Sequence, residues 1–180
     1  MRRTELERLG IQLPALPTVV LGALPDGAVW AERLGAMGLD VVCSGAAADT
    51  AETVAAAAAA VPYRPLKARA GDAHELFAAG CRLIESAGAV PEGAYRLSAA
   101  DGVLPAVGAA HPGAEDFNEV ARACVRAARA LGAANLWVAA GPGLERLRRE
   151  DVEAKLAALV EGAHQARLAL AKDQFDLAGP

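Results

Sequence analysis

The sequence predicts an α/β fold, a mostly parallel sheet with flanking helices in the form of a truncated or compact (β/α) barrel of the TIM type. Apolar runs suited to strands alternate with amphipathic stretches suited to helices along the chain. The strand runs are continuously apolar, as in sheets whose two faces are both covered. The pattern yields five strands, or six if residues 95–109 add one. Because a closed barrel has eight strands in about 250 residues, a truncated barrel or an open half-barrel is expected.

The first half of the chain alternates strands and helices with clear boundaries. A turn at Pro25–Gly27 closes the first strand, and Gly38 ends the first helix. Asp49 and Glu52 have the spacing of a capping box, which starts an Ala-rich helix. Pro65 weakens the third strand because proline has no backbone N–H to donate. The predicted elements are strand 17–24, helix 28–37, strand 39–45, a helix from about 49 to 60, and strand 63–70.

The second half is predicted to contain three helices and a strong strand. Asp72 and Glu75 repeat the capping-box spacing, Leu76 and Leu83 belong to one apolar stripe, and Gly88 ends that helix. The predicted elements are helix 73–88, helix 115–131, strand 135–140 and helix 150–171.

Residues 95–109 allow two interpretations. Asp101-Gly102 is a hairpin signal between two short apolar runs, so the segment could form two strands joined by a tight turn. It could equally form one strand and an irregular loop. No linker divides the chain, so a single domain over residues 1–180 is expected, with residues 1–12 and 172–180 frayed.

Composition excludes several classes of protein. The net charge is -4 and the pI is near 5.4, whereas nucleic-acid or anionic-membrane surfaces need clustered Lys and Arg. The longest apolar stretch, at 54–62, is about half the length of a membrane span. The N-terminus lacks the pattern of a signal peptide, so a cytoplasmic protein without nucleic-acid or membrane partners is expected.

The three cysteines do not form a metal-binding or redox motif. Cys43, Cys81 and Cys124 include no CxxC pair, and an odd number of cysteines cannot be fully paired within the chain. Cys81 and Cys124 fall on the apolar faces of predicted helices and are interpreted as small buried hydrophobes.

Two stretches carry a resemblance to a known family. "LPALPTVVLGALPDG" (13–27) continues through "LGAMGLDVVCSG" (34–45), and "NLWVAAGPGLERLRREDVEAKLAALVEGAHQAR" spans 135–167. The order, the spacing and the Gly-Leu-Asp-Val, Leu-Trp-Val and Gly-Leu words resemble the catalytic domain of cobalamin-independent methionine synthase. That family and its shorter relatives belong to the uroporphyrinogen decarboxylase-like barrel superfamily. The resemblance covers about half of the chain.

The resemblance implies a zinc-dependent methyl transfer to a thiol, but the matched positions lack the required groups. In the family, zinc binds the substrate thiol and lowers its pKa, and a catalytic zinc needs three His, Cys or carboxylate ligands. Pro142 stands at the position of the family's last Cys ligand. Ala46 and Ser44 replace the Glu and His after the second strand, and Ala23 replaces the substrate-binding Ser. No His-x-Cys pair occurs, so no metal site and no cofactor are predicted.

Other candidate site residues lie just after predicted strands, where β/α proteins place their reactive groups. Cys43 is a possible nucleophile, although the sequence does not place a base beside it. The Gly-Pro-Gly loop before the last helix could bind a phosphate with help from basic side chains at the third strand. Asp26 and Asp101 could act as acid and base, or could simply form turns with the glycines that follow them. The candidate catalytic residues are therefore Cys43 and Asp101, and the candidate substrate-binding residues are Asp26, Ser44, Lys67, Arg69, Gly141 and Gly143.

The histidines are interpreted as solvated or capping residues. His74, His111 and His164 have a spacing that fits no recognised metal site.

Two classes of function are left open by the sequence. The first is a degenerate methionine-synthase-like barrel that binds or assembles without catalysis, as a homo-oligomer or beside a larger homologous subunit. Its unpaired sheet edges would favour such assembly. The second is an enzyme that transfers an alkyl group to a thiol, or acts on a small phosphorylated or carboxylated metabolite.

Overall fold

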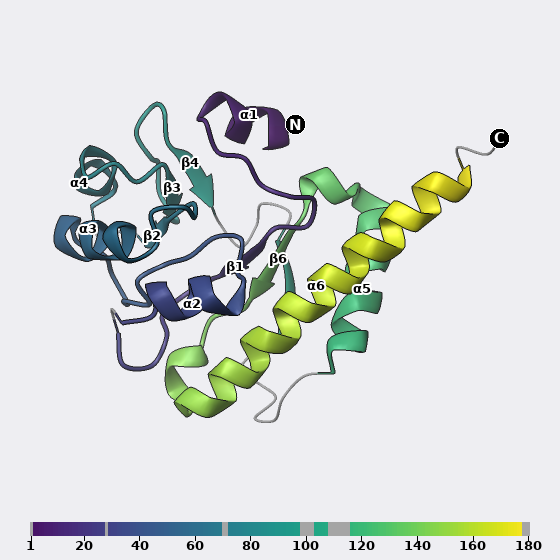
Figure 1. Cartoon of the computed structure of the whole chain (residues 1–180). Coiled ribbons are helices and arrows are strands. Elements are labelled where there is room, and N and C mark those ends of the chain that lie inside the picture. Colours follow the sequence, from purple (N-terminus) through teal and green to yellow (C-terminus); the bar gives the residue numbers. More distant parts are fainter. Residues whose placement is uncertain (1, 28, 70–71, 98–102, 108–115, 178–180) are drawn as a thin grey trace.

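The computed structural model describes residues 2–27, 29–69, 72–97, 103–107 and 116–177. It confirms the predicted α/β class, with parallel strands and flanking helices (Figure 1). The helices are α1 (Arg2–Arg8), α2 (Ala31–Met37), α3 (Ala51–Ala60), α4 (Ala73–Ala78), α5 (Phe117–Leu131) and α6 (Arg149–Leu177), with short 3-10 turns at Ala133–Asn135 and Leu144–Arg146. The strands are β1 (Thr18–Val20), β2 (Lys67–Arg69), β3 (Leu83–Glu85), β4 (Tyr95–Leu97), β5 (Val103–Val107) and β6 (Trp137–Ala140).

The parallel strands follow one another around the sheet in chain order. β5 pairs with β6 and β6 pairs with β1, while β2, β3 and β4 pair in sequence, all in parallel. Val41 and Val42 connect the two groups. Val41 N–H donates to Thr18 O at 3.1 Å, and Val42 forms a parallel bridge with Leu66. Because the last strand pairs with the first, the order is that of a (β/α) barrel, and β4 and β5 are its two terminal strands.

Three apolar clusters show which side of the sheet each residue faces. The inner core lies on the concave side, and α1 contributes Leu6 to it, so α1 covers the amino ends of the strands (Figure 1). An outer core packs α2, α5 and α6 against β1 and β6, and a smaller one packs α3 and α4 against β2 and β3. The inner core consists of Leu6, Val19, Leu21, Val41, Leu83, Tyr95, Leu97, Trp137 and Ala139.

One predicted helix was wrong in its second half. The helix expected over 73–88 ends at Ala78, and Leu83–Glu85 form strand β3 instead. Gly80 has φ +93°, a left-handed conformation that ends the helix. Leu83 then faces the inner core and Ile84 faces α4, the alternation of a strand that is covered on both sides.

Residues 95–109, for which the sequence allowed two interpretations, contain two strands and no hairpin within the described residues. β4 is parallel to β3 and β5 is parallel to β6, whereas a hairpin requires antiparallel partners. The Asp101-Gly102 turn lies outside the described residues.

Several boundaries also differ from prediction. Residues 39–45 form a single bridge rather than a regular strand. Thr50 with Thr53, rather than Asp49 with Glu52, makes the capping box of α3. Near the two ends of the chain, α1 occupies Arg2–Arg8 and α6 continues to Leu177.

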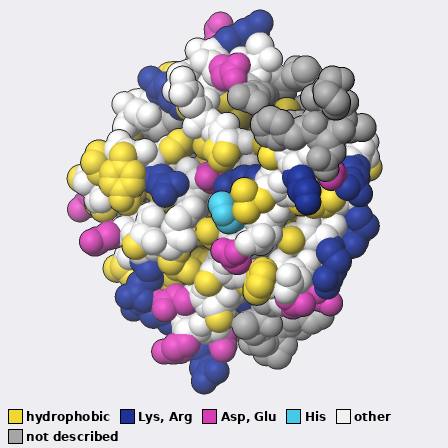
Figure 2. Space-filling view, turned by 45° about the vertical axis from the view of Figure 1, so that its right-hand side comes forward, with side chains coloured by type: hydrophobic (Ala, Val, Ile, Leu, Met, Phe, Trp, Pro, Cys, Tyr) yellow, Lys and Arg dark blue, Asp and Glu magenta, His cyan; other side chains and the backbone are white. Residues whose placement is uncertain are grey.

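The surface mixes charges of both signs. Figure 2 turns forward the side that carries α5 and α6, and Lys and Arg side chains gather along one margin of this face. Within the described part of the chain, no helix combines the length and apolarity needed to cross a membrane.

Candidate functional site

Six residues form a polar group whose side chains meet near the carboxyl ends of neighbouring strands. The parallel arrangement places these ends at the same rim of the sheet, which is where β/α enzymes carry their active sites. Most of these side chains are buried or half-buried. We call the group the strand-end cluster, and its members are Cys43, Ser44, Asp49, Lys67, Arg69 and Glu85.

An ion pair between Lys67 and Glu85 lies at the centre of the strand-end cluster. Only 1% of the Lys67 side chain and 17% of the Glu85 side chain are exposed. Glu85 Oε1 also accepts from the backbone N–H of Gly22 at 3.0 Å, and Arg69 Nε lies 3.8 Å from the same carboxylate. The carboxylate of Glu85 therefore connects the ends of β1, β2 and β3.

Asp49 organises the second half of the cluster. Its Oδ1 accepts from the hydroxyl of Ser44 and from Thr53 Oγ1 at 3.1 Å, and its Oδ2 accepts from the Arg69 N–H at 2.7 Å. The Ser44 Oγ in turn accepts from the N–H of Ala46 at 3.0 Å. These bonds fix the loop before α3 against the end of β2.

The Cys43 thiol is held in its neutral form. Burial raises the pKa of the Cys43 thiol, and the nearby charges of Asp49 and Glu85 raise it further. The positive charge of Lys67 and a hydrogen bond with the backbone of Gly45 act in the opposite direction. A reactive cysteine needs thiolate character, so this environment opposes nucleophilic chemistry.

The Gly-Pro-Gly loop after β6 packs against the loop after β1. Gly22 has φ +83°, a conformation that favours glycine, and a Cβ built on it would lie 3.2 Å from Pro142 Cα, so the two backbones approach closely here. Gly141 N–H donates to Val107 O at 3.0 Å, and Gly143 has φ +97° at the start of a short 3-10 turn. The loop thus closes against its neighbours next to the strand-end cluster.

The structure separates the other predicted site residues from this cluster or does not describe them. Asp26 is exposed in a turn with φ +62°. His74 and His164 are exposed on helices. Asp101 and His111 lie outside the described residues.

Sequence reasoning missed Asp49 and Glu85 as members of the cluster. Asp49 was interpreted as a helix cap, and Glu85 was placed in a helix. A carboxylate at the end of the short apolar run Leu83-Ile84 was the available signal for Glu85, but it required recognising that run as a strand.

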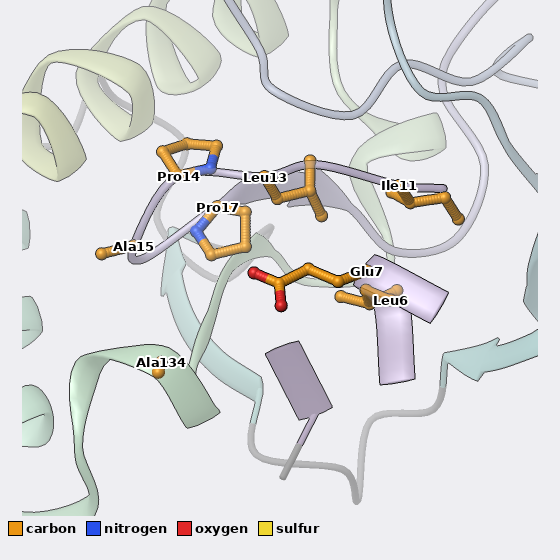
Figure 3. A pocket seen from close by; sticks show the side chains of 8 residues that line it. All are labelled: Leu6, Glu7, Ile11, Leu13, Pro14, Ala15, Pro17 and Ala134. Atoms are coloured by element: carbon orange, nitrogen blue, oxygen red, sulfur yellow. The ribbon is translucent and has the colours of Figure 1, made fainter. Parts of the chain in front are cut away.

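Two cavities lined by described residues contain no member of the strand-end cluster. One, of about 10 Å³, lies between α1 and the segment leading to β1 and is lined by Leu6, Glu7 and Ile11 among others (Figure 3). That volume is close to the space of a single water. Another, of about 260 Å³, is lined by Val54, Cys81 and Leu83 and neighbouring residues. No three His, Cys, Asp or Glu residues of the described ranges lie close enough to share a metal ion.

The fold and the strand-end cluster define an α/β protein with parallel strands, flanking helices and a buried polar rim. Among solved structures, the chain is similar to a B12-independent methionine synthase from Shewanella sp. W3-18-1, with 16% identity and a TM-score of 0.37. The match covers 79% of this chain and 55% of that one, so the chain spans about half the length of the protein it matches. No family model matches the sequence, and no curated protein matches it.

Proposed function

We propose that this chain is a zinc-free barrel-type protein that binds or assembles, as a homo-oligomer or beside a larger homologous subunit, rather than a methyltransferase. The observation that carries the proposal is the internal pairing of the strand-end cluster. Lys67 pairs with Glu85, and both oxygens of Asp49 accept hydrogen bonds from within the chain. Charged groups that already satisfy one another stabilise the rim and are poorly placed to bind a substrate.

Two further features support the same proposal. The neutral Cys43 thiol is a weak nucleophile and a weak metal ligand, because both roles need the thiolate. Pro142 occupies the position where the sequence resemblance implies a cysteine ligand, and proline has no side-chain donor atom.

A combined metal and ligand experiment tests the proposal. The purified chain is incubated with zinc, and its metal content and thermal unfolding are measured with homocysteine, a folate and a sugar phosphate. We expect no stoichiometric zinc and no shift of the unfolding midpoint with any of the three. Stoichiometric zinc that is lost in Cys43→Ser but kept in Cys124→Ser would contradict the proposal.

One observation favours an alternative, an enzyme that alkylates a thiol or acts on a small carboxylated or phosphorylated metabolite. The charge of Lys67 opposes the rise in the Cys43 pKa, and closer approach of Lys67 would increase the thiolate fraction. Alkylation of the folded protein by iodoacetamide near pH 8 separates the two proposals. Slow labelling that follows unfolding favours binding or assembly, and rapid labelling that Cys43→Ser abolishes favours the enzyme.

A further inference from the structure

A groove runs between α5 and α6 on the outer surface of the molecule. The two helices lie side by side and run in the same direction, with Gly162 against Val120 at one end and Asp173 against Arg129 at the other (Figure 1). Between them lies a hollow of about 430 Å³. Its lining includes Ala121 and Val125 of α5 and Ala166 and Ala169 of α6. Small side chains of this kind allow the backbone of another helix to approach closely.

Three arginines of α5 line the same groove. Arg122, Arg126 and Arg129 follow one another at spacings of four and three residues, so they form one row on a helix face. The side chains of Arg122 and Arg129 are 60% and 65% exposed. Arg122 and Arg126 also line a second hollow, of about 370 Å³, on the other side of the row. The row is therefore open to solvent on both sides.

Among the described residues, carboxylates pair with the arginines at the two ends of this row. Arg129 pairs with Asp173 at 2.6 Å, and Arg122 Nη2 lies 3.9 Å from Asp116 at the opposite end. Arg126, between them, has no carboxylate within ion-pair distance among the described residues. The middle of the groove thus carries a positive charge above a floor of small apolar residues.

The shape of the groove indicates an extended partner rather than a single ion. From Asn118 to Arg129 the groove follows α5 for about 17 Å, roughly three helical turns. Carboxylates spaced by three and four residues on a partner helix would match the rise between the arginines. Arg side chains bind carboxylates strongly because the planar guanidinium can donate two parallel hydrogen bonds.

On the described side chains of α6, three of the five carboxylates already pair with arginines of the chain. Asp151 accepts from Arg148, Glu153 pairs with Arg33 and with Arg149, and Asp173 is already bound to Arg129. The other two, Glu150 and Glu161, are eleven residues apart, so they do not match the spacing of three and four residues in the arginine row.

We propose that the α5–α6 groove is a docking site for an acidic helical segment of a partner protein, with Arg126 as its central contact. The inference rests on the proposed assembly function and names the chemistry of the partner. The carboxylates of that segment face the arginine row, and its small residues face Ala121 and Ala169.

The test measures binding of a fluorescently labelled helical peptide of about 15 residues built from Ala and Glu, by anisotropy at physiological ionic strength. We expect binding that weakens about tenfold in Arg126→Ala and further in Arg126→Glu. Arg148→Ala is the matched control, because Arg148 is an exposed arginine outside the groove, and it should leave the affinity unchanged. A peptide with Gln in place of Glu should not bind.

Three other results would overturn the inference. The first is a wild-type chain that does not bind the peptide, or binding that Arg126→Glu leaves unchanged. The second is full displacement of the peptide by millimolar inorganic phosphate, which would indicate a small-anion site. The third is a change of molar mass in light scattering when Arg126→Glu is made without peptide. That result would assign the groove to a second copy and would leave the proposed assembly function standing.

Discussion

Lys67, the first residue of β2, forms a buried ion pair with Glu85, the last residue of β3. The backbone N–H of Gly22, just after β1, also donates to the Glu85 carboxylate. The pair lies above the apolar inner core, so it closes the core at this rim. The charged side chains of Lys67 and Glu85 therefore join β1, β2 and β3 at this rim, a structural role rather than a catalytic one.

Replacing Lys67 with Met tests this structural role. The change leaves the Glu85 carboxylate largely buried without its main partner, and such a loss costs about 3–5 kcal/mol in the free energy of unfolding. Because Glu85 keeps some exposure, we expect the lower end of that range, measured by urea denaturation. Arg69→Met is the matched control on the same strand: Arg69 is 39% exposed and 3.8 Å from Glu85, so the cost should stay below about 1 kcal/mol. Equal effects of the two changes would refute the structural role.

Arg167 and Asp40 form a second ion pair at the opposite end of the strands. Arg167 donates to the carboxylate of Asp40, to Leu16 O at 2.9 Å and to Ala15 O at 2.8 Å. Asp40 Oδ2 also accepts from the N–H and the hydroxyl of Thr18, both at 2.8 Å. The arginine therefore attaches α6 to the beginning of β1.

We expect Arg167→Ala to lower the free energy of unfolding by about 2–4 kcal/mol, because a half-buried carboxylate and two carbonyls lose their donor. Arg148→Ala removes an exposed pair with Asp151 three residues away, and should cost less than about 1 kcal/mol. Chemical denaturation of both variants measures the difference. A loss for Arg167→Ala no larger than that for Arg148→Ala would show that the contact adds little to stability.

Cys124 makes the stability of the fold sensitive to alkaline pH. The thiol is buried between α5 and the sheet, and burial raises its pKa from 9.0 to about 11, with the charge of Arg167 opposing the change. A raised pKa in the folded state means that the unfolded chain loses its proton first as pH rises. This contribution to stability is therefore complete below pH 9 and is lost between about pH 9 and 11.

Denaturation midpoints measured from pH 8 to 11 check this expectation. We expect the free energy of unfolding of the wild type to fall more steeply with pH than that of Cys124→Ala. The variant lacks the Cys124 thiol and keeps the other two cysteines. The alanine variant also loses packing, but that cost does not depend on pH, so only the slopes are compared. Parallel slopes for the two proteins would contradict the assignment.

The local sequence pattern predicted helices that bury one face and strands that are covered on both faces. The apolar stripe of α5 indicated its end at Leu131, because Val120, Cys124 and Ala128 face the outer core while the other positions face solvent. The strand at 135–140 was found because an unbroken apolar run suits a strand covered on both faces. The parallel class followed from the alternation of such elements.

Strand β3 and the cluster residues Asp49 and Glu85 could not be predicted, because they depend on contacts between residues far apart in the sequence. Leu83 fits a helical stripe with Leu76 as well as it fits a strand, and only Gly80 with its positive φ marked the break. The cluster residue Glu85 could not be assigned until that break was known. Asp49 looks like a helix cap in sequence, yet its carboxylate binds the backbone of Arg69, twenty residues away.

Gly162 sets the distance between α5 and α6. A Cβ at this position would lie 2.5 Å from Val120 Cγ1 and 2.8 Å from the carbonyl oxygen of Phe117, so alanine would force the helices apart. In an exposed helix, Gly→Ala stabilises by about 1 kcal/mol, but overpacking a tight contact typically costs about 1–3 kcal/mol. Because one of the contacted atoms belongs to the backbone and cannot rotate away, we expect Gly162→Ala to be destabilising by about 1–2 kcal/mol. Gly88→Ala is the control, since its added Cβ would be 3.7 Å from its nearest contact, and thermal unfolding of the two variants measures the difference. A stabilised Gly162→Ala would show that the two helices can separate at little cost.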